Sequence, residues 1–78
     1  MIIYFYTKKD CPLCDKGFAE LQLLKKEASF DIEVRDIYTD DIWLEKYQIR
    51  IPVIEDKNGN VLDEGIISYT KLKKELLE

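Results

Sequence analysis

The sequence of 78 residues predicts an α/β fold in which three helices flank a four-stranded mixed sheet. A strand-like run, a segment with helical periodicity and a second strand-like run follow one another, and a crossover helix of this kind joins parallel strands. Asn58-Gly59 lies between two later apolar runs and predicts an antiparallel hairpin. The expected order is β-α-β-α-β-β-α. Composition does not change along the chain, so we expect residues 1–78 to form a single domain.

The first strand is expected over residues 2–6, where β-branched and aromatic side chains follow one another without a polar interruption. This pattern is typical of a strand buried on both faces in the middle of a sheet. A helix should begin near Cys11, because Pro12 is tolerated in a first helical turn. Apolar residues at spacings of three and four form the inner stripe of this helix: Cys14, Phe18, Leu21, Leu24 and Ala28.

The second strand and the second helix are expected between residues 32 and 48. Residues 32–37 alternate apolar and charged side chains, which predicts a half-exposed strand at or near a sheet edge. The next three polar residues, Thr39, Asp40 and Asp41, offer capping oxygens to a short helix that ends near Gln48. Its apolar residues are Ile42, Trp43 and Tyr47, of which we expect Trp43 and Tyr47 to pack into the core.

The hairpin and the last helix complete the chain. Residues 49–54 form an apolar run, and its proline, Pro52, is compatible with a strand only at the first residue. Residues 53–55 and 61–63 are therefore expected to pair, and Gly65 to end the second strand. Ser68 and Thr70 can cap a final helix whose apolar side chains are Tyr69, Leu72, Leu76 and Leu77.

Charge and composition restrict the functions that this chain can have. The net charge of −4 argues against nucleic acid as a partner, because phosphate binding needs a basic surface. No histidine is present, which removes Cys-His and Ser-His nucleophile pairs. The apolar run at the N-terminus stops at Thr7, too short for a secretion signal or a membrane span, so we expect a cytoplasmic protein.

The two cysteines, Cys11 and Cys14, occur two apart where the first strand gives way to a helix. In a cytosolic βαβ context this spacing indicates a redox pair. Two alternatives remain: a pair of buried thiols acting as small apolar side chains, or half of a zinc site. A zinc site needs four ligands and the chain has no other cysteine or histidine, so it would require a dimer, and we expect no metal.

The chain resembles the thioredoxin superfamily, and within it the small glutaredoxin-like proteins. The matching segments cover nearly the whole length: Tyr6-Thr7-Lys8, Cys11-Pro12-Leu13-Cys14, Ile51-Pro52-Val53 and Gly65. The resemblance implies a thioredoxin fold in which Pro52 forms a cis peptide bond facing the cysteines. It also implies that Ile51, Pro52, Gly65 and Lys8 contribute to substrate binding.

Departures from the family pattern bear on the electron donor. Glutaredoxins that use glutathione commonly carry Thr-Val-Pro and, after the last strand, Gly-Gly followed by acidic residues. This chain has Arg50-Ile51-Pro52, and a single glycine in Glu64-Gly65-Ile66-Ile67-Ser68. Thioredoxins commonly carry the motif Trp-Cys-Gly-Pro-Cys and a buried aspartate beneath the two cysteines. This chain has a different motif, and its residues 2–6 contain no acidic residue. The resemblance therefore leaves glutathione, as a thiol co-substrate, and thioredoxin reductase as alternative reductants, and it implies no bound cofactor.

The expected activity is that of a thiol-disulfide oxidoreductase acting on disulfide-containing proteins or small disulfides. A free cysteine, with a pKa of about 8.5, is mostly protonated at neutral pH. The helix N-terminus, the Cys14 thiol and the ammonium groups of Lys8 and Lys9 favour a thiolate at Cys11, whereas Asp10 and Asp15 oppose it. Cys11 is the expected nucleophile and Cys14 the resolving thiol. The alternative is a non-enzymatic module that senses redox state or docks on proteins.

Overall fold

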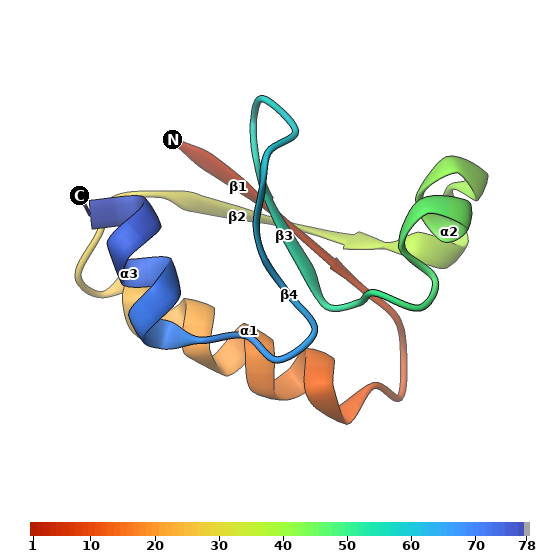
Figure 1. The fold of residues 1–78 in the computed structure, drawn as a ribbon, viewed down its shortest axis with the longest axis horizontal. Coiled ribbons are helices and arrows are strands. Elements are labelled where there is room, and N and C mark those ends of the chain that lie inside the picture. The colour runs from red at the N-terminus through yellow and green to blue at the C-terminus, as the bar shows by residue number, and fades with distance from the viewer. Residues whose placement is uncertain (78) are drawn as a thin grey trace.

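The computed structural model describes residues 1–77 and has one sheet with helices packed on it (Figure 1). Its strands are β1 (Ile2–Thr7), β2 (Asp31–Asp36), β3 (Val53–Asp56) and β4 (Val61–Glu64). Its helices are α1 (Pro12–Lys25), α2 (Asp41–Tyr47) and α3 (Tyr69–Leu77). A short 3-10 helix, η1 (Ile37–Thr39), precedes α2. Apart from η1, this is the predicted order β-α-β-α-β-β-α.

The strand order in the sheet is β2-β1-β3-β4, with β1 and β2 parallel and the other two pairs antiparallel. The predicted mixed sheet is confirmed, with β1 inside it and β2 at its edge. Tyr6, near the end of β1, lies opposite Val53, the first residue of β3. Since β1 leads to the cysteines and β3 follows Pro52, this register brings both segments to the same end of the sheet.

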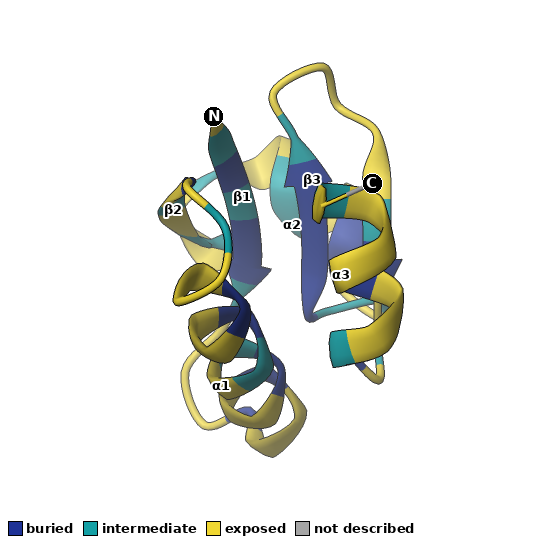
Figure 2. Ribbon diagram, turned by 90° about the vertical axis from the view of Figure 1, so that its left-hand side faces the viewer, coloured by how far each residue is buried: buried dark blue, intermediate teal, exposed yellow. Residues whose placement is uncertain are grey.

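The core lies on both faces of the sheet because side chains alternate along β1. Ile3 and Phe5 belong to a cluster with residues of α1 and α3, among them Cys14, Leu21, Leu24 and Leu72. Tyr6 belongs to a second cluster, with Tyr47 of α2, Ile37 and Val53. Figure 2 shows β1 and β3 largely buried, while α1 and α3 present exposed residues on their outer sides.

The segment between β2 and α2 differs from its prediction in detail. The predicted cap is confirmed, because Asp40 Oδ1 accepts the N–H groups of Ile42 at 2.8 Å and Trp43 at 3.3 Å. The additional turn η1 arises because the carboxylate of Asp36 accepts the N–H of Tyr38 at 2.9 Å. Ile42 is 73% exposed, so the packing surface of α2 is provided by Trp43 and Tyr47, as expected.

The apolar run at residues 49–54 enters the sheet only at Val53. Arg50 and Ile51 instead donate their N–H groups to the carbonyl of Tyr47, at 2.9 and 3.2 Å, which extends the turn after α2. Ile49 is consequently 94% exposed. Pro52 comes just before the strand, where its missing N–H removes no ladder bond. Leu77 is also exposed, since it lies in the last turn of α3.

The predicted hairpin is confirmed. β3 and β4 are antiparallel, and Gly59 has the positive φ of 84° that a tight turn favours at glycine. Asp56 stabilises the turn by accepting the N–H groups of Asn58 at 2.8 Å and Asn60 at 3.0 Å. Within residues 1–77, every helix is too short or too polar to cross a bilayer.

Candidate active site

The two cysteines lie at the start of α1 and form a disulfide, with their Cα atoms 5.1 Å apart. Cys11 is the N-cap residue of α1, and Pro12 occupies the first turn as predicted. The Sγ atom of Cys11 accepts the N–H of Cys14 at 3.2 Å. Asp10, just before the pair, has a φ of 56°, a left-handed conformation that turns the chain sharply out of the loop after β1. Cys11 consequently lies at the N-terminal end of α1.

The cysteines differ in exposure in the predicted direction. Cys11 is 8% exposed and Cys14 is 2% exposed, so both are buried and the margin is small. Cys14 lies on the inner stripe of α1, with Leu21 and Leu24. The sulfur of Cys11 accepts the N–H of Cys14 and belongs to the N-cap residue, at the positive end of the helix dipole, and both stabilise a negative charge. Of the two sulfurs, Cys11 is therefore the one better stabilised as a thiolate.

The segment around Pro52 lies against α1, the helix that carries the cysteines. The Ile51–Pro52 peptide bond is cis, as the resemblance implied. Ile51 is half-buried and packs on the cluster that contains Cys11 and Cys14. The carbonyl of Pro52 accepts the N–H of Gly65 at 2.8 Å, and Gly65 has a φ of 72°. Ile51, Pro52 and Gly65, which are far from the cysteines in sequence, thus lie in one region of the fold.

Two residues of this region, Gly17 and Ile67, were not anticipated from the sequence. A Cβ atom on Gly17 would lie 2.7 Å from Ile67 Cγ1 and 3.3 Å from Pro52 Cγ. Glycine is therefore what allows α1 to approach Pro52 and Ile67 so closely. A glycine inside a helical pattern was a signal that could have revealed this contact.

Asp63 organises the connection between β4 and α3. Its carboxylate is buried and accepts the N–H groups of Glu64 at 2.9 Å and Ser68 at 2.8 Å. Lys71 Nζ lies 3.5 Å from the same carboxylate. Ser68 Oγ accepts the N–H of Lys71 at 3.2 Å, which confirms the predicted cap of α3. The N–H groups of Ser68 and Lys71 are therefore bonded within the chain itself.

Charged residues flank the cysteines in the sequence, on the loop before α1 and in its first turn. Lys8, which the resemblance places in the substrate site, is exposed, as are Lys9 and Asp10. Asp15 is exposed on α1 next to Cys14. Arg50, near Pro52, forms an ion pair with Glu64, with 2.8 Å between Nε and Oε2. Lys8 and Lys9 are thus the exposed cations nearest in sequence to Cys11.

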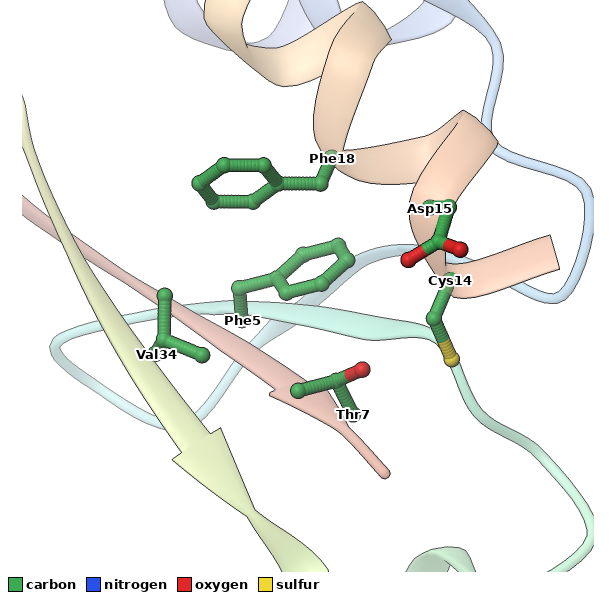
Figure 3. Close-up of a pocket in the computed structure, with 6 residues that line it drawn as sticks. All are labelled: Phe5, Thr7, Cys14, Asp15, Phe18 and Val34. Carbon is green, nitrogen blue, oxygen red and sulfur yellow. The ribbon is translucent and has the colours of Figure 1, made fainter. Parts of the chain in front are cut away.

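A pocket of about 310 Å³ reaches the disulfide from the β2 side of α1. Figure 3 shows Phe18 extending from α1 over Phe5 of β1, with Val34 of β2 at the far end. Thr7, Cys14 and Asp15 lie at the other end of the pocket (Figure 3). Phe5 and Phe18 form an edge-to-face pair with ring centroids 5.4 Å apart. The walls are therefore mainly apolar, and one end carries a sulfur and a carboxylate.

A buried polar network lies on the opposite face of the sheet. The carboxylate of Glu55 accepts the hydroxyl of Tyr6 at 2.9 Å and the hydroxyl of Tyr47. Arg35 donates to the Tyr6 hydroxyl at 2.7 Å, and its guanidinium lies over the Tyr4 ring at 3.7 Å. Burial, followed by the hydrogen bond with Glu55, raises the pKa of Tyr6 to about 12. The network joins β1, β3 and α2 on the face of the sheet opposite α1 and the cysteines.

No cluster of three or more histidine, cysteine, aspartate or glutamate side chains suited to a metal ion occurs within residues 1–77. The chemical groups gathered at this end of the sheet are the two sulfurs, the backbone N–H groups of α1 and the carboxylate of Asp15. The chemical change open to this arrangement is the reversible conversion of the Cys11–Cys14 disulfide into two thiols, with uptake of two electrons and two protons.

Comparisons with known proteins agree with this geometry. The family model described as glutaredoxin-like domain (DUF836) matches residues 2–78. A solution structure of protein Ne2328 from Nitrosomonas europaea has a TM-score of 0.82 and 24% identity, over 95% of this chain and 88% of that chain. A crystal structure of target protein XcR50 from X. campestris has a TM-score of 0.73 and 25% identity, over 92% and 91% of the two chains.

A more distant similarity connects the fold to thioredoxins. Thioredoxin 1 from Thermosipho africanus has a TM-score of 0.62 and 17% identity, over 96% of this chain and 93% of that chain. The mixed four-stranded sheet with its three helices is therefore a thioredoxin-like fold, as the sequence indicated.

Proposed function

The chain belongs to the glutaredoxin-like domain family (DUF836), and on this premise we propose that it is a thiol-disulfide oxidoreductase. The observation that carries the proposal is the Cys11–Cys14 disulfide at the N-terminus of α1, the helix that packs through Gly17 against cis-Pro52. As a structural disulfide this bond would stabilise the fold less than one that closes a long loop, because the stabilisation falls with loop length. The position at a helix end instead suits a sulfur that alternates between thiolate and disulfide.

The reduced pair begins the reaction. The Cys11 thiolate attacks one sulfur of a substrate disulfide, forms a mixed disulfide and releases the other substrate sulfur as a thiolate that takes a proton from water. The N–H of Cys14, which lies 3.2 Å from Sγ of Cys11 in the disulfide form, and the positive end of α1 stabilise the attacking anion. Ile51, Pro52, Gly65 and Lys8 are the residues that we assign to substrate contact.

Cys14 completes the exchange. As a thiolate, it attacks Cys11 in the mixed disulfide and displaces the second substrate thiolate, which is protonated by solvent. The product is the Cys11–Cys14 disulfide, the form seen in the structure. The substrate disulfide has gained two electrons from the protein and two protons from solvent, and the proton of the Cys14 thiol has passed to solvent. A cellular dithiol or two monothiols return the electrons, with glutathione and thioredoxin reductase as the candidate donors in the cytoplasm.

Serine variants test the assignment of the two sulfurs. Reduced Cys14→Ser protein mixed with a small disulfide should accumulate a mixed disulfide at Cys11, which intact-mass spectrometry detects. Cys11→Ser protein should form an adduct much more slowly, because Cys14 is the less exposed of the two sulfurs and is not at the N-cap position where the helix end stabilises a thiolate. Equal adduct formation by both variants, or full disulfide-reductase activity of Cys11→Ser, would contradict the assigned roles.

A turnover assay separates an enzyme from a docking module. Reduction of insulin or bis(2-hydroxyethyl) disulfide is followed with glutathione plus its reductase, and in parallel with thioredoxin reductase. Turnover abolished by Cys11→Ser supports the oxidoreductase. Absence of turnover with both donors, while dithiothreitol still reduces Cys11–Cys14, would favour a redox-sensing or docking role.

A further inference from the structure

The side pocket between α1 and β2 is a feature that the exchange chemistry at Cys11 does not use. It has a volume of about 310 Å³ and is lined by Phe5, Thr7, Cys14, Asp15, Phe18 and Val34 (Figure 3). This volume is at the small end of the range for ligand sites and is large enough for one substantial side chain. A single side chain is therefore the size of group that the pocket fits.

The pocket is lined by residues of α1, β1 and β2, whereas Pro52 directly precedes β3, which neighbours β1 on the other side. Gly17 of α1 faces Pro52 and Ile67 so closely that no side chain fits between them. The pocket instead opens toward the edge of the sheet, where β2 has no further strand beside it and Val34 is 54% exposed. A group bound there reaches Cys14 without displacing the packing around Pro52.

The lining favours apolar groups over anions. Phe5, Phe18 and Val34 supply apolar walls. Of the described residues that line the pocket, only Asp15 carries a charge. Its carboxylate would repel a second carboxylate in the same pocket, as in glutathione, and would accept a hydrogen bond from a neutral or cationic group.

We propose that this pocket is a substrate-selecting subsite that takes an apolar side chain of a protein substrate next to its reacting cysteine. The inference rests on the proposed oxidoreductase function, and it names the substrate class as protein disulfides with a neighbouring apolar residue. The pocket is continuous with the disulfide, because Cys14 belongs to both.

Chain geometry allows one substrate to contact Cys11 and the pocket together. The Cα atoms of Cys11 and Cys14 are 5.1 Å apart. Consecutive Cα atoms of an extended substrate are about 3.8 Å apart. The Cα of a residue next to the attacked cysteine is therefore displaced by most of the distance between Cys11 and Cys14, and its side chain extends further. The pocket therefore discriminates between substrates through the residue adjacent to the cysteine.

Peptide disulfides provide the test. Protein that has been reduced and freed of reductant is mixed with symmetric disulfides of two capped peptides, Gly-Cys-Xaa-Gly and Gly-Xaa-Cys-Gly, in which Xaa is Leu, Ser or Asp. Second-order rate constants for release of peptide thiol are divided by the same protein's rate constant with bis(2-hydroxyethyl) disulfide, which has no side chain for the pocket. In at least one series the Leu peptide should react about tenfold faster than the Ser peptide, a typical discrimination for a small apolar pocket.

Two edge-strand valines give a matched pair of variants. Val34→Glu places a carboxylate in the pocket wall and should bring the ratio of Leu to Ser rate constants close to one. Val61→Glu makes the same change at a 40% exposed valine on the opposite edge strand, β4, and should keep the wild-type ratio. Asp15→Asn should raise the normalised rate of the Asp peptide several-fold and leave the preference for Leu over Ser in place.

The outcomes distinguish the two proposals. If the wild-type protein reduces none of these disulfides, the proposed function fails. If it reduces bis(2-hydroxyethyl) disulfide but treats the Leu and Ser peptides alike in both series, the subsite is refuted and the oxidoreductase stands. A Leu preference that survives Val34→Glu, or that Val61→Glu removes equally, also refutes the pocket as its origin.

Discussion

Adding one methyl group at Gly17 should destabilise the protein, although alanine is the better helix former. Gly17 lies inside α1, where exchange of glycine for alanine ordinarily stabilises by about 0.8–1.0 kcal/mol. Here the new Cβ would lie 2.7 Å from Ile67 Cγ1, closer than real Cβ contacts, and 3.3 Å from Pro52 Cγ. Overpacking of a core costs about 1–3 kcal/mol. We therefore expect Gly17→Ala to lower the free energy of unfolding by about 1 kcal/mol.

Urea unfolding of the oxidised protein measures this change. In a domain of this size, a loss of 1 kcal/mol lowers the melting temperature by about 4–8 °C, so calorimetry offers a second measurement. Ala19→Gly, at an exposed position of the same helix, supplies the control. It measures the helix-propensity effect alone and should cost about 1 kcal/mol.

The source of the penalty is isolated by truncating the residue that the methyl group meets. In an Ile67→Ala background the closest contact is absent, so Gly17→Ala should become nearly neutral or stabilising. A Gly17→Ala protein more stable than the wild type would refute the reasoning. An undiminished penalty in the Ile67→Ala background would show that the close approach is not its cause.

Two further predictions concern the network behind the site. Because the pKa of Tyr6 is raised to about 12 in the folded protein, its neutral form is favoured by folding; this stabilisation is complete below about pH 10 and is lost as pH rises through 12. Unfolding free energies measured from pH 9 to 12 should fall less steeply for Tyr6→Phe than for the wild type, and parallel curves would contradict this. Tyr47→Phe removes a hydroxyl that donates to the buried carboxylate of Glu55 and should cost about 1.5–3 kcal/mol. Tyr38→Phe, at a 63% exposed position, should change stability little in the same urea experiment, and equal effects of the two variants would exclude a special role for the Tyr47 hydroxyl.

The fold and the position of the cysteine pair could be predicted from the sequence because their signals are local. Pro12 beside Cys11 indicates a helix start, and Asn58-Gly59 between apolar runs indicates a hairpin. Each of these signals depends on conformational preferences of neighbouring residues, and the structure confirms both elements. The family pattern added the cis bond at Pro52, which no local preference specifies.

An apolar pattern alone does not set the extent of an element, because contacts with other segments decide which of its residues are used. Residues 49–51 are apolar enough for a strand, yet two of their N–H groups bond to the carbonyl of Tyr47. Ile42 continues an apolar pattern, yet the sheet and α2 meet through Trp43 and Tyr47. Burial is decided by which elements face each other, and periodicity alone does not contain that information.

The sequence by itself determined the cysteine pair on which the proposed chemistry rests, because two thiols at this spacing at a predicted helix start are a property of a few consecutive residues. Only the tertiary structure decided what surrounds them. The bond from Tyr6 to Glu55 joins residues 49 positions apart, and the approach of Gly17 to Ile67 depends on how α1 lies across the sheet. The side pocket likewise needs α1, β1 and β2 together. Contacts of this kind follow from the packing of whole elements, which is why the exchange reaction could be predicted from the sequence and the proposed choice of substrate could not.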